Sequence, residues 1–393
     1  MPFRFTTAGE SHGPELVAIV EGVPAGLGMS VDDIDRDLAR RQLGHGRGGR
    51  MKIETDQAMI VSGVRHGTTL GTPIALRIGN RDWKNWIEEM AAGQPESGEK
   101  GAPLTVPRPG HADLAGLQKF GLNDVRSVLE RASARETAAR VAVGAIARKL
   151  LAGFEITVVS HVTRIGIIKA DRPAVSPEDF REVDQSPVRC LDGKAADAMV
   201  AEIDRAREDG ESLGGVFEVQ AFGLIPGLGS YASGPERLGG RIGGALMSIP
   251  AVKGAEIGAG FDLARGKGSA VHDEIYFDDT GYHRRTNNAG GLEGGMTTGE
   301  PLVVRVAMKP ISTLMSPLRT VDLTTGQDAA AQSERSDVTA VPAAGVIAEA
   351  LVAIVLADAM LEKFAGDSLT EMARNCHAFL AAAGRRWETL DQS

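Results

Sequence analysis

The spacing of hydrophobic and polar residues predicts strands and helices that intermix along the chain. Short apolar runs, several rich in β-branched residues, predict strands over residues 16–21, 58–62, 74–78, 155–160, 215–221 and 302–308. Helical spacing or a high alanine content predicts helices over residues 30–41, 136–151, 195–208, 237–247 and 343–364. Ser30 is a favourable cap for the first helix, and Gly366 is a stop signal after the last. This mixture predicts an α+β layered fold.

Segments rich in glycine separate several of these elements. Residues 43–51 contain four glycines in nine positions, which favours a basic loop over a helix. Residues 91–110, with many Gly, Pro and charged residues, and the glycine-rich residues 266–299 are predicted to be irregular. Residues after about 384 are expected to fray at the end of the chain.

Two Ala-rich helices each follow a similar short motif. Arg131-Ala-Ser-Ala precedes the helix predicted over 136–151, and Arg335-Ser-Asp-Val precedes the helix predicted over 343–364. A pseudo-repeated architecture would explain this echo. Similar composition would explain it equally well, because short repeats are weak signals without a sustained period.

The composition is that of a globular protein in a reducing compartment. The hydrophobic fraction of 42% supports a core, and the two cysteines, Cys190 and Cys376, lack the spacing of a disulfide framework or a zinc site. Residues 1–10 lack the apolar region of a signal peptide, and the apolar run 350–357 is too short to span a bilayer. We therefore expect a cytoplasmic protein without a membrane segment. The net charge of −9 disfavours nucleic acid, so anions must be bound by local positive clusters.

A first candidate site lies in Gly9-Glu-Ser-His-Gly13, where Ser11 and His12 stand between glycines just before a predicted strand. Glycine lets the backbone approach a ligand closely, and histidine can transfer a proton near neutral pH. The loop is therefore a candidate acid site. The alternative is a tight turn in which His12 only satisfies backbone groups.

Arginine is concentrated at the end of the first predicted helix and in the following loop. The cluster comprises Arg40, Arg41, His45, Arg47 and Arg50. A guanidinium group binds phosphate or carboxylate through two parallel hydrogen bonds, so the cluster predicts an anionic ligand. A solvated run of surface charge is the alternative.

Two further segments carry groups of the same kind. Arg108, His111 and Asp113 follow a loop stiffened by prolines, and His111 is a second candidate proton donor. Residues 131–137, Arg-Ala-Ser-Ala-Arg-Glu-Thr, are predicted to open a helix whose free amides favour an anion. Capping of that helix by Ser133 is an alternative explanation.

Segments late in the chain supply pliable backbone, a cation and hydroxyl groups. Residues 290–296 and Lys309-Pro-Ile-Ser-Thr313 suit a flat cofactor that carries a phosphate. Neither segment has the spacing of a Walker loop, and no Gly-x-Gly-x-x-Gly lies between a predicted strand and helix. Arg335-Ser-Asp337 adds a carboxylate suited to accepting a proton, although a buried ion pair explains this motif equally well.

Taken in this order, these segments resemble the chorismate synthase family. The three signature regions of the family are similar to residues 9–24, residues 131–137, and Arg335-Ser-Asp337 with Glu349 downstream. The resemblance covers nearly the whole chain. It implies one large catalytic domain over residues 1–384, with a short tail over 385–393. It also implies a β-α-β sandwich with internal pseudo-symmetry.

The resemblance implies a reaction as well. Members of the family are lyases that eliminate phosphate from 5-enolpyruvylshikimate 3-phosphate to form chorismate, the last step of the shikimate pathway, which serves aromatic amino-acid biosynthesis. This trans-1,4 elimination needs reduced FMN, although no net redox change occurs. By resemblance, His12 protonates the departing phosphate, His111 stabilises the reduced flavin, and Asp337 works with flavin N5 to remove the C6 hydrogen. Ser11 and Ser133 are the implied relays.

The resemblance assigns the other site residues in two sets. The substrate carries a phosphate and two carboxylates, and its implied ligands are Arg41, Arg47, Arg50, Arg108, Arg135 and Arg335. The implied flavin contacts are Arg131, Ala132, Ser133, Pro250, Ala251, Gly295, Lys309, Pro310, Ile311, Ser312, Thr313 and Arg335. Pro250 is a less usual residue at its position, which leaves its own contact open. No metal ligand is implied.

The resemblance further implies a cytoplasmic homotetramer. NADPH would take part only if the enzyme reduced its own flavin, and no added reductase domain is visible in 393 residues. We therefore expect an external flavin reductase or another source of reduced flavin. A second hypothesis, an RNA-binding protein that uses loop 44–50, is weakened by the negative net charge and the 4% aromatic content. A third is a member that has lost activity, against which the intact Ser-His, Arg-Pro-Gly-His and Arg-Ser-Asp elements argue.

Overall fold

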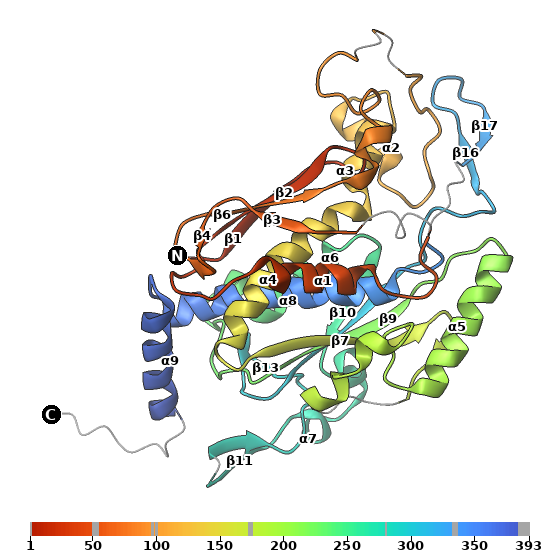
Figure 1. The fold of residues 1–393 in the computed structure, drawn as a ribbon. Coiled ribbons are helices and arrows are strands. Elements are labelled where there is room, and N and C mark those ends of the chain that lie inside the picture. The colour runs from red at the N-terminus through yellow and green to blue at the C-terminus, as the bar shows by residue number, and fades with distance from the viewer. Residues whose placement is uncertain are drawn as a thin grey trace.

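Two antiparallel sheets enclose a layer of helices in the computed structural model, which describes residues 2–48, 55–95, 98, 101–171, 176–279, 281–331 and 337–383 (Figure 1). The first sheet has the order β1-β2-β6-β3, formed by Arg4–Ala8, Glu15–Glu21, Ile74–Gly79 and Ala58–Ile60. The second has the order β10-β15-β9-β7-β8, formed by Val252–Ile257, Leu302–Met308, Gly215–Phe222, Thr157–Ile165 and Ile168–Lys169.

Four helices fill the space between the sheets, namely α1 (Val31–Gln42), α4 (Thr137–Ala152), α6 (Leu238–Met247) and α8 (Val341–Phe364) (Figure 1). Helix α4 packs against the four-stranded sheet, α8 packs against the five-stranded sheet, and the two helices pack on each other. This arrangement confirms the predicted β-α-β sandwich. Each half contributes one sheet and one long Ala-rich helix, so the layers of the two halves correspond.

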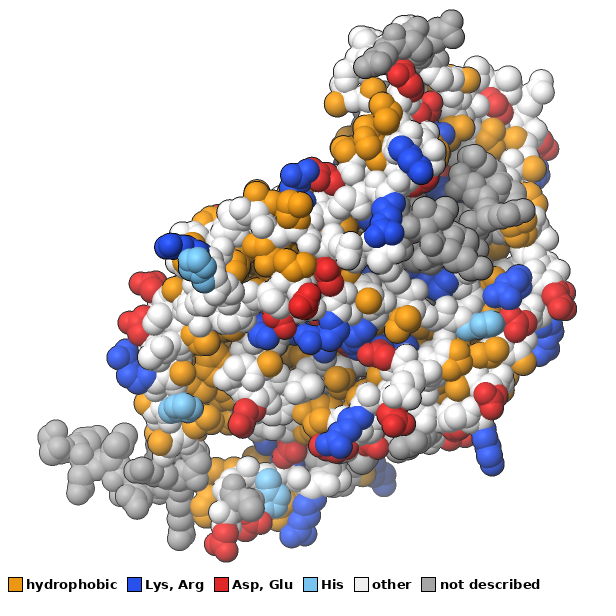
Figure 2. Space-filling model, in the orientation of Figure 1, with side chains coloured by type: hydrophobic (Ala, Val, Ile, Leu, Met, Phe, Trp, Pro, Cys, Tyr) orange, Lys and Arg blue, Asp and Glu red, His pale blue; other side chains and the backbone are white. Residues whose placement is uncertain are grey.

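Strand residues alternate between the helix layer and the outside of the sandwich. In β2, Leu16, Ala18 and Val20 are buried against the helices, whereas Ile19 on the opposite face is 46% exposed. Met59 of β3 is also exposed. Figure 2 shows hydrophobic side chains gathered over the four-stranded sheet. The outer face of this sheet therefore exposes apolar side chains.

The two central helices approach each other closely because small residues line their contact. A Cβ atom added to Gly144 of α4 would lie 2.2 Å from the Cβ atom of Ala350 in α8. Real Cβ atoms do not approach so closely, so only glycine at position 144 allows α4 and α8 to pack at this distance.

Gly144→Ala is expected to lower the free energy of unfolding by about 1–3 kcal/mol, the usual cost of overpacking a dense core. Urea denaturation would measure the loss. Gly193→Ala is the matched control, because a Cβ atom added at this first residue of α5 (Gly193–Glu208) meets no atom within 4 Å. Equal stability of the two variants would show that α4 and α8 separate without cost.

Helix α8 contains the apolar run 350–357, which is too short by itself to span a bilayer. The apolar run 350–357 belongs to a helix of 24 residues that is long and apolar enough to cross a membrane. Most of that helix is buried inside the protein, between the sheets and against α4. A central position in a folded protein requires the same composition, so α8 is a core helix.

A buried ion-pair network joins α1 to α8. The carboxylate of Glu349, which is fully buried, accepts hydrogen bonds from Arg40 Nη1 at 2.7 Å, Arg189 Nη2 at 2.9 Å and Ser160 Oγ at 2.7 Å. Burial alone would raise the pKa of Glu349, but the charges of Arg40, Arg189 and Arg148 lower it to about 2. Arg40, part of the arginine cluster in the sequence, therefore has a structural partner.

Most predicted elements are confirmed to within a few residues, but the pattern missed others. The unpredicted helices are α2 (Asp113–Phe120), α3 (Arg126–Ala132) and α9 (Leu369–Ala383), and the unpredicted strands of the large sheets are β1, β8 and β10. Residues 266–299 were wrongly predicted to be irregular. They contain α7 (Gly268–Val271) and the hairpins β11 (Ile275–Asp278) with β12 (Gly281–Arg284) and β13 (Leu292–Glu293) with β14 (Met296–Thr297). Few side chains of these hairpins are buried, so buried and exposed residues do not alternate along their strands.

Candidate active site

The structure brings together two motifs that are about 120 residues apart in the sequence. The loop between β1 and β2 places Ser11 beside Ser133, whose hydroxyl group lies 3.1 Å from that of Ser11. The backbone N–H of Ser11 donates to the carbonyl oxygen of Glu130 at 3.0 Å, which fixes the loop on α3. Ser11 is almost fully buried. The two serines implied as relays therefore form one hydrogen-bonded pair.

The ring of His12, the next residue of this loop, is contacted at one edge by Glu130 and on one face by Trp86. Its Nδ1 atom lies 2.8 Å from Oε1 of Glu130, and its backbone N–H donates to Oε2 of Glu130 at 2.8 Å. Its ring stacks on Trp86 with centroids 4.0 Å apart and planes inclined by 27°. Burial opposes ionisation of Glu130, but the hydrogen bonds and charge of His12 lower the pKa of this carboxyl group.

Two of the predicted substrate arginines share one buried carboxylate. Asp56 accepts from Arg41 Nη1 at 3.3 Å and forms a short ion pair with Arg135. Arg41 also donates to Thr137 Oγ1 at 3.1 Å and to the carbonyl oxygen of Ala134 at 3.1 Å, at the start of α4. Burial, together with the nearby charges of other arginines, lowers the pKa of Arg41 to about 10. Arg41 and Arg135 are therefore held in fixed orientations.

The basic loop that follows α1 is tied to Asp337. The carboxylate of Asp337 pairs with Arg47 Nη1 at 2.9 Å and accepts from the backbone N–H of Gly48 at 2.6 Å. Gly46 has a φ of +86°, and a Cβ atom there would lie 2.8 Å from Ile203 Cγ2, so only glycine fits this turn. The candidate proton acceptor thus lies beside a candidate substrate arginine.

A second group of site residues surrounds Asp113, the first residue of α2. Asp113 is fully buried and accepts from Arg108 Nε at 2.9 Å, and it forms a short contact with His111 Nδ1. These hydrogen bonds outweigh burial and hold the pKa of Asp113 well below its usual range. Lys309 Nζ donates to the carbonyl oxygen of Gly110 at 2.7 Å. His111, Arg108 and the loop after β15 therefore form one group.

The Pro250-Ala251 turn lies against the same loop. The backbone N–H of Lys309 donates to the carbonyl oxygen of Ala251 at 2.9 Å. Ala251 has a φ of +67°, a conformation that an L-residue adopts only at a cost, and such backbone strain is often found at ligand sites. Arg140 Nη1 of α4 donates to Ser248 Oγ at 2.9 Å, which places this turn beside the first half of α4.

Gly295, another predicted flavin contact, is not brought close to this turn in the single chain. Its carbonyl oxygen accepts from the N–H of Leu238, the first residue of α6, whereas Pro250 and Ala251 follow the other end of that helix. Ten helical residues span about 15 Å. Gly295 therefore lies apart from the other cofactor candidates.

Residues 131–137 do not open a single helix, which corrects the sequence prediction. They include the end of α3, a short 3-10 helix over Ala134–Glu136, and the first residue of α4. Ser133 accepts from the N–H of Arg135 at 3.3 Å and caps the short 3-10 helix, whereas the residue at the N-cap of α4 is Glu136. The guanidinium group of Arg131 donates to the carbonyl oxygens of Gly9 at 2.9 Å and Thr7 at 3.0 Å.

Two predicted substrate ligands, Arg50 and Arg335, lie outside the described residues. Among those that are described, the sequence did not single out the buried acids Asp56 and Glu130, or Trp86. Glu130 could have been found from its position directly before Arg131, the first residue of the second signature region. Asp56 follows a polar stretch without a motif, and Trp86 lies in an apparently irregular segment, so neither carried a signal.

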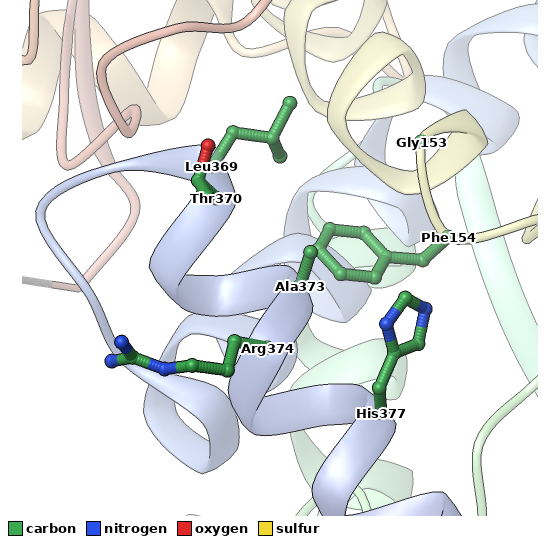
Figure 3. Close-up of a pocket in the computed structure, with 7 residues that line it drawn as sticks. All are labelled: Gly153, Phe154, Leu369, Thr370, Ala373, Arg374 and His377. Carbon is green, nitrogen blue, oxygen red and sulfur yellow. The ribbon is translucent and has the colours of Figure 1, made fainter.

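The surface pocket in Figure 3 lies away from these residues. It is lined by side chains of α9 and of the turn after α4, among them Phe154, Arg374 and His377. Of the described residues, no three His, Cys, Asp or Glu side chains gather in a way that could hold a metal ion. The polar groups suited to chemistry are thus those around Ser11, His12 and Asp337, and those around His111.

Comparisons with known proteins agree with this arrangement. The family model described as chorismate synthase matches residues 3–361. A chorismate synthase of Salinispora tropica is 56% identical over 387 residues, covering 96% of this chain and 98% of that protein. One of Thermobifida fusca is 54% identical over 385 residues, with the same coverage. A solved structure titled "Crystal Structure of Chorismate Synthase" aligns with a TM-score of 0.79 and 42% identity, over 98% of this chain and 99% of that one. The chain therefore belongs to the chorismate synthase family.

Proposed function

We propose that the protein converts 5-enolpyruvylshikimate 3-phosphate to chorismate and phosphate by a trans-1,4 elimination that uses reduced FMN without net redox change. The observation that carries this proposal is the convergence of Ser11, Ser133 and His12 from two distant signature regions. Such convergence is typical of a catalytic site, because a structural role would not require a histidine and two serines from separate motifs to meet.

The arginines suit a substrate with one phosphate and two carboxylates. Arg41 and Arg135 are held by Asp56, so their orientation is fixed before a ligand arrives. Arg47 and Arg108 are anchored by Asp337 and Asp113 in the same way. We propose these four as substrate ligands together with Arg50 and Arg335.

The groups near Ala251 and Lys309 fit a phosphorylated flavin. Lys309 supplies a cation, and Ser312 and Thr313 supply hydroxyl groups, which is the donor set that a phosphate needs. The left-handed backbone of Ala251 fits a turn shaped for close contact with a ligand. The proposed flavin contacts are Arg131, Ala132, Ser133, Pro250, Ala251, Gly295, Lys309, Pro310, Ile311, Ser312, Thr313 and Arg335.

Each titratable residue has a proposed role in this reaction. When bound, the reduced flavin supplies electron density that assists loss of phosphate. His12 donates a proton to the departing phosphate, which neutralises the charge that develops there. His111, oriented by Asp113, stabilises the reduced cofactor with its positive charge. Asp337 accepts the proton that leaves C6, with Ser11 and Ser133 as relays.

We also propose a cytoplasmic homotetramer. The exposed apolar side chains of Ile19, Met59 and Val61 in and after the strands of the first sheet support an interface between subunits. In such an assembly, Gly295 would contact the flavin bound by a neighbouring subunit, since it lies apart from the other proposed flavin contacts of its own chain.

An anaerobic assay with the enolpyruvyl substrate tests both the reaction and the source of electrons. We expect phosphate release with chemically reduced FMN, and none with NADPH and oxidised FMN, because the described residues form one sandwich without a separate nucleotide-binding domain. An external flavin reductase is then the required partner. Turnover in both assays would contradict that requirement, and absence of phosphate release in both would overturn the proposed reaction.

A further inference from the structure

The side chain of Glu130 contacts His12 at two places, its backbone and its ring. Its two oxygens bind the backbone N–H and the ring Nδ1 of His12, each at 2.8 Å. We propose that Glu130 is a positioning residue that keeps the Nδ1 atom of His12 protonated, so that Nε2 is the atom that gives its proton to the departing phosphate. This inference rests on the proposed function.

The chemistry of Glu130 determines which ring nitrogen carries the proton. An ionised carboxylate only accepts hydrogen bonds, so the Nδ1 atom that it contacts must be the donor. Glu130 is almost fully buried, and the interactions with His12 lower the pKa of its carboxyl group in spite of that burial. It is therefore ionised when the ring is in place, and it fixes the tautomer of His12.

The other charged and aromatic groups around this pair reinforce the arrangement. Arg126 Nη1 lies 3.4 Å from Oε1 of Glu130, and Arg126 Nε pairs with Glu89 at 2.8 Å. The indole N–H of Trp86 donates to Asp82 Oδ2 at 2.8 Å, which holds the ring on which His12 stacks. The carboxylate contacts one edge of the imidazole and the indole stacks on one face, so the ring is held in one orientation.

The proton balance follows from these contacts. The charged imidazole of His12 loses its Nε2 proton to a phosphate oxygen as the C–O bond to phosphate breaks. The neutral ring keeps its Nδ1–H bond to Glu130 and carries the lone pair on Nε2. Asp337 then releases the proton taken from C6 to water, and water returns a proton to Nε2, so the cycle consumes no other reagent.

Glu130→Gln tests the inference with little change of shape. The glutamine oxygen is expected to keep the hydrogen bond from the backbone N–H of His12, which turns its NH₂ group toward Nδ1. Nδ1 lies closer to Oε1, at 2.8 Å, than to Oε2, at 3.0 Å, so it then faces mainly the NH₂ donor, which favours the proton of the neutral ring on Nε2. Nitrogen-15 NMR of histidine-labelled protein, with His12→Asn for assignment, reports this directly. In the unaltered protein Nδ1 should remain protonated as the ring loses its charge, whereas in Glu130→Gln it should not.

Glu130→Gln is also expected to lower kcat about 100-fold with little change in the substrate KM. General acid catalysis contributes about 10²–10⁴-fold, and the variant leaves His12 with the wrong tautomer for it. Glu89→Gln is the matched control, because Glu89 belongs to the same cluster through Arg126 but does not contact the imidazole. It should preserve both the tautomer and the rate.

Three outcomes decide the inference. A His12 tautomer that is the same in Glu130→Gln and the unaltered protein would overturn it, as would a changed tautomer with unchanged kcat. The expected change in both measurements would support it. The NMR measurement needs no substrate, so an unaltered protein without activity would count against the proposed reaction while the role of Glu130 in fixing the tautomer would still be decided.

Discussion

Replacing His12 or Asp337 with alanine is expected to lower kcat by about 10²–10⁴-fold, the range that a positioned acid or base contributes. Flavin binding should change much less, because neither His12 nor Asp337 is among the proposed flavin contacts, whereas the Lys309 segment with its cation and hydroxyl groups is left unchanged. Single-turnover kinetics with reduced FMN, beside a fluorescence titration with oxidised FMN, would separate the two effects.

Matched controls exist for both substitutions. His377→Ala removes an imidazole from the surface pocket of Figure 3, and Asp204→Ala removes an exposed carboxylate that pairs with His45. Both controls should retain kcat. If His12→Ala and Asp337→Ala weakened flavin binding as strongly as they lowered kcat, these residues would belong to the cofactor site and the assigned proton transfers would be wrong.

Glu349→Ala is expected to lower the free energy of unfolding by about 3–5 kcal/mol, because it removes the fully buried carboxylate that Arg40 and Arg189 share and leaves them the more exposed Asp184. Urea denaturation at neutral pH would measure the effect. Glu178→Ala, which breaks the exposed pair with Arg181, should cost less than about 1 kcal/mol. A similar loss in both variants would mean that the buried network does not stabilise the fold.

The same carboxylate predicts how stability depends on pH. In the folded protein the pKa of Glu349 is about 2, below the ordinary value of 4.5 that we assign to the unfolded chain. A lowered pKa stabilises the fold above the unfolded value, and this contribution is lost as pH falls from about 4.5 toward 2. The difference in stability between the unaltered protein and Glu349→Ala should therefore shrink across that window. A difference that stayed constant would contradict the assignment.

The sequence predicted those elements whose pattern is set locally. Strand β15 has the predicted bounds, Leu302–Met308, because its short apolar run, rich in β-branched valine, is typical of a strand. Helix α8 begins two residues earlier than predicted, since Pro342 is favourable in the first turn of a helix. Alanine content alone was enough to place α4 to within about one residue at each end.

Elements that depend on distant partners could not be predicted in this way. Strand β10 is half-exposed along most of its length and is defined by its pairing with β15, about fifty residues later. Strand β1 contains only one large apolar residue, Phe5, and is fixed by its register with β2. Pairing across the sheet, which local pattern does not record, forms these strands.

The candidate site shows the same division. Motifs indicated His12, Arg41 and Arg135 as chemical groups, but their anchors Glu130 and Asp56 became visible only in three dimensions. Asp56 precedes Arg135 by 79 residues, and Glu130 follows His12 by 118. A carboxylate that orients a functional group has no fixed spacing from it, so sequence motifs identify the acting residues more readily than their supports.

The central place of α8 has a consequence for synthesis of the chain. This helix covers the inner face of the five-stranded sheet and one side of α4, yet it begins only at residue 341 of 393. At about 5–20 residues per second, the ribosome takes roughly 20–70 s to reach it. During that interval the apolar faces it will cover have no native partner, so the nascent chain depends on protection from aggregation until its last helices emerge.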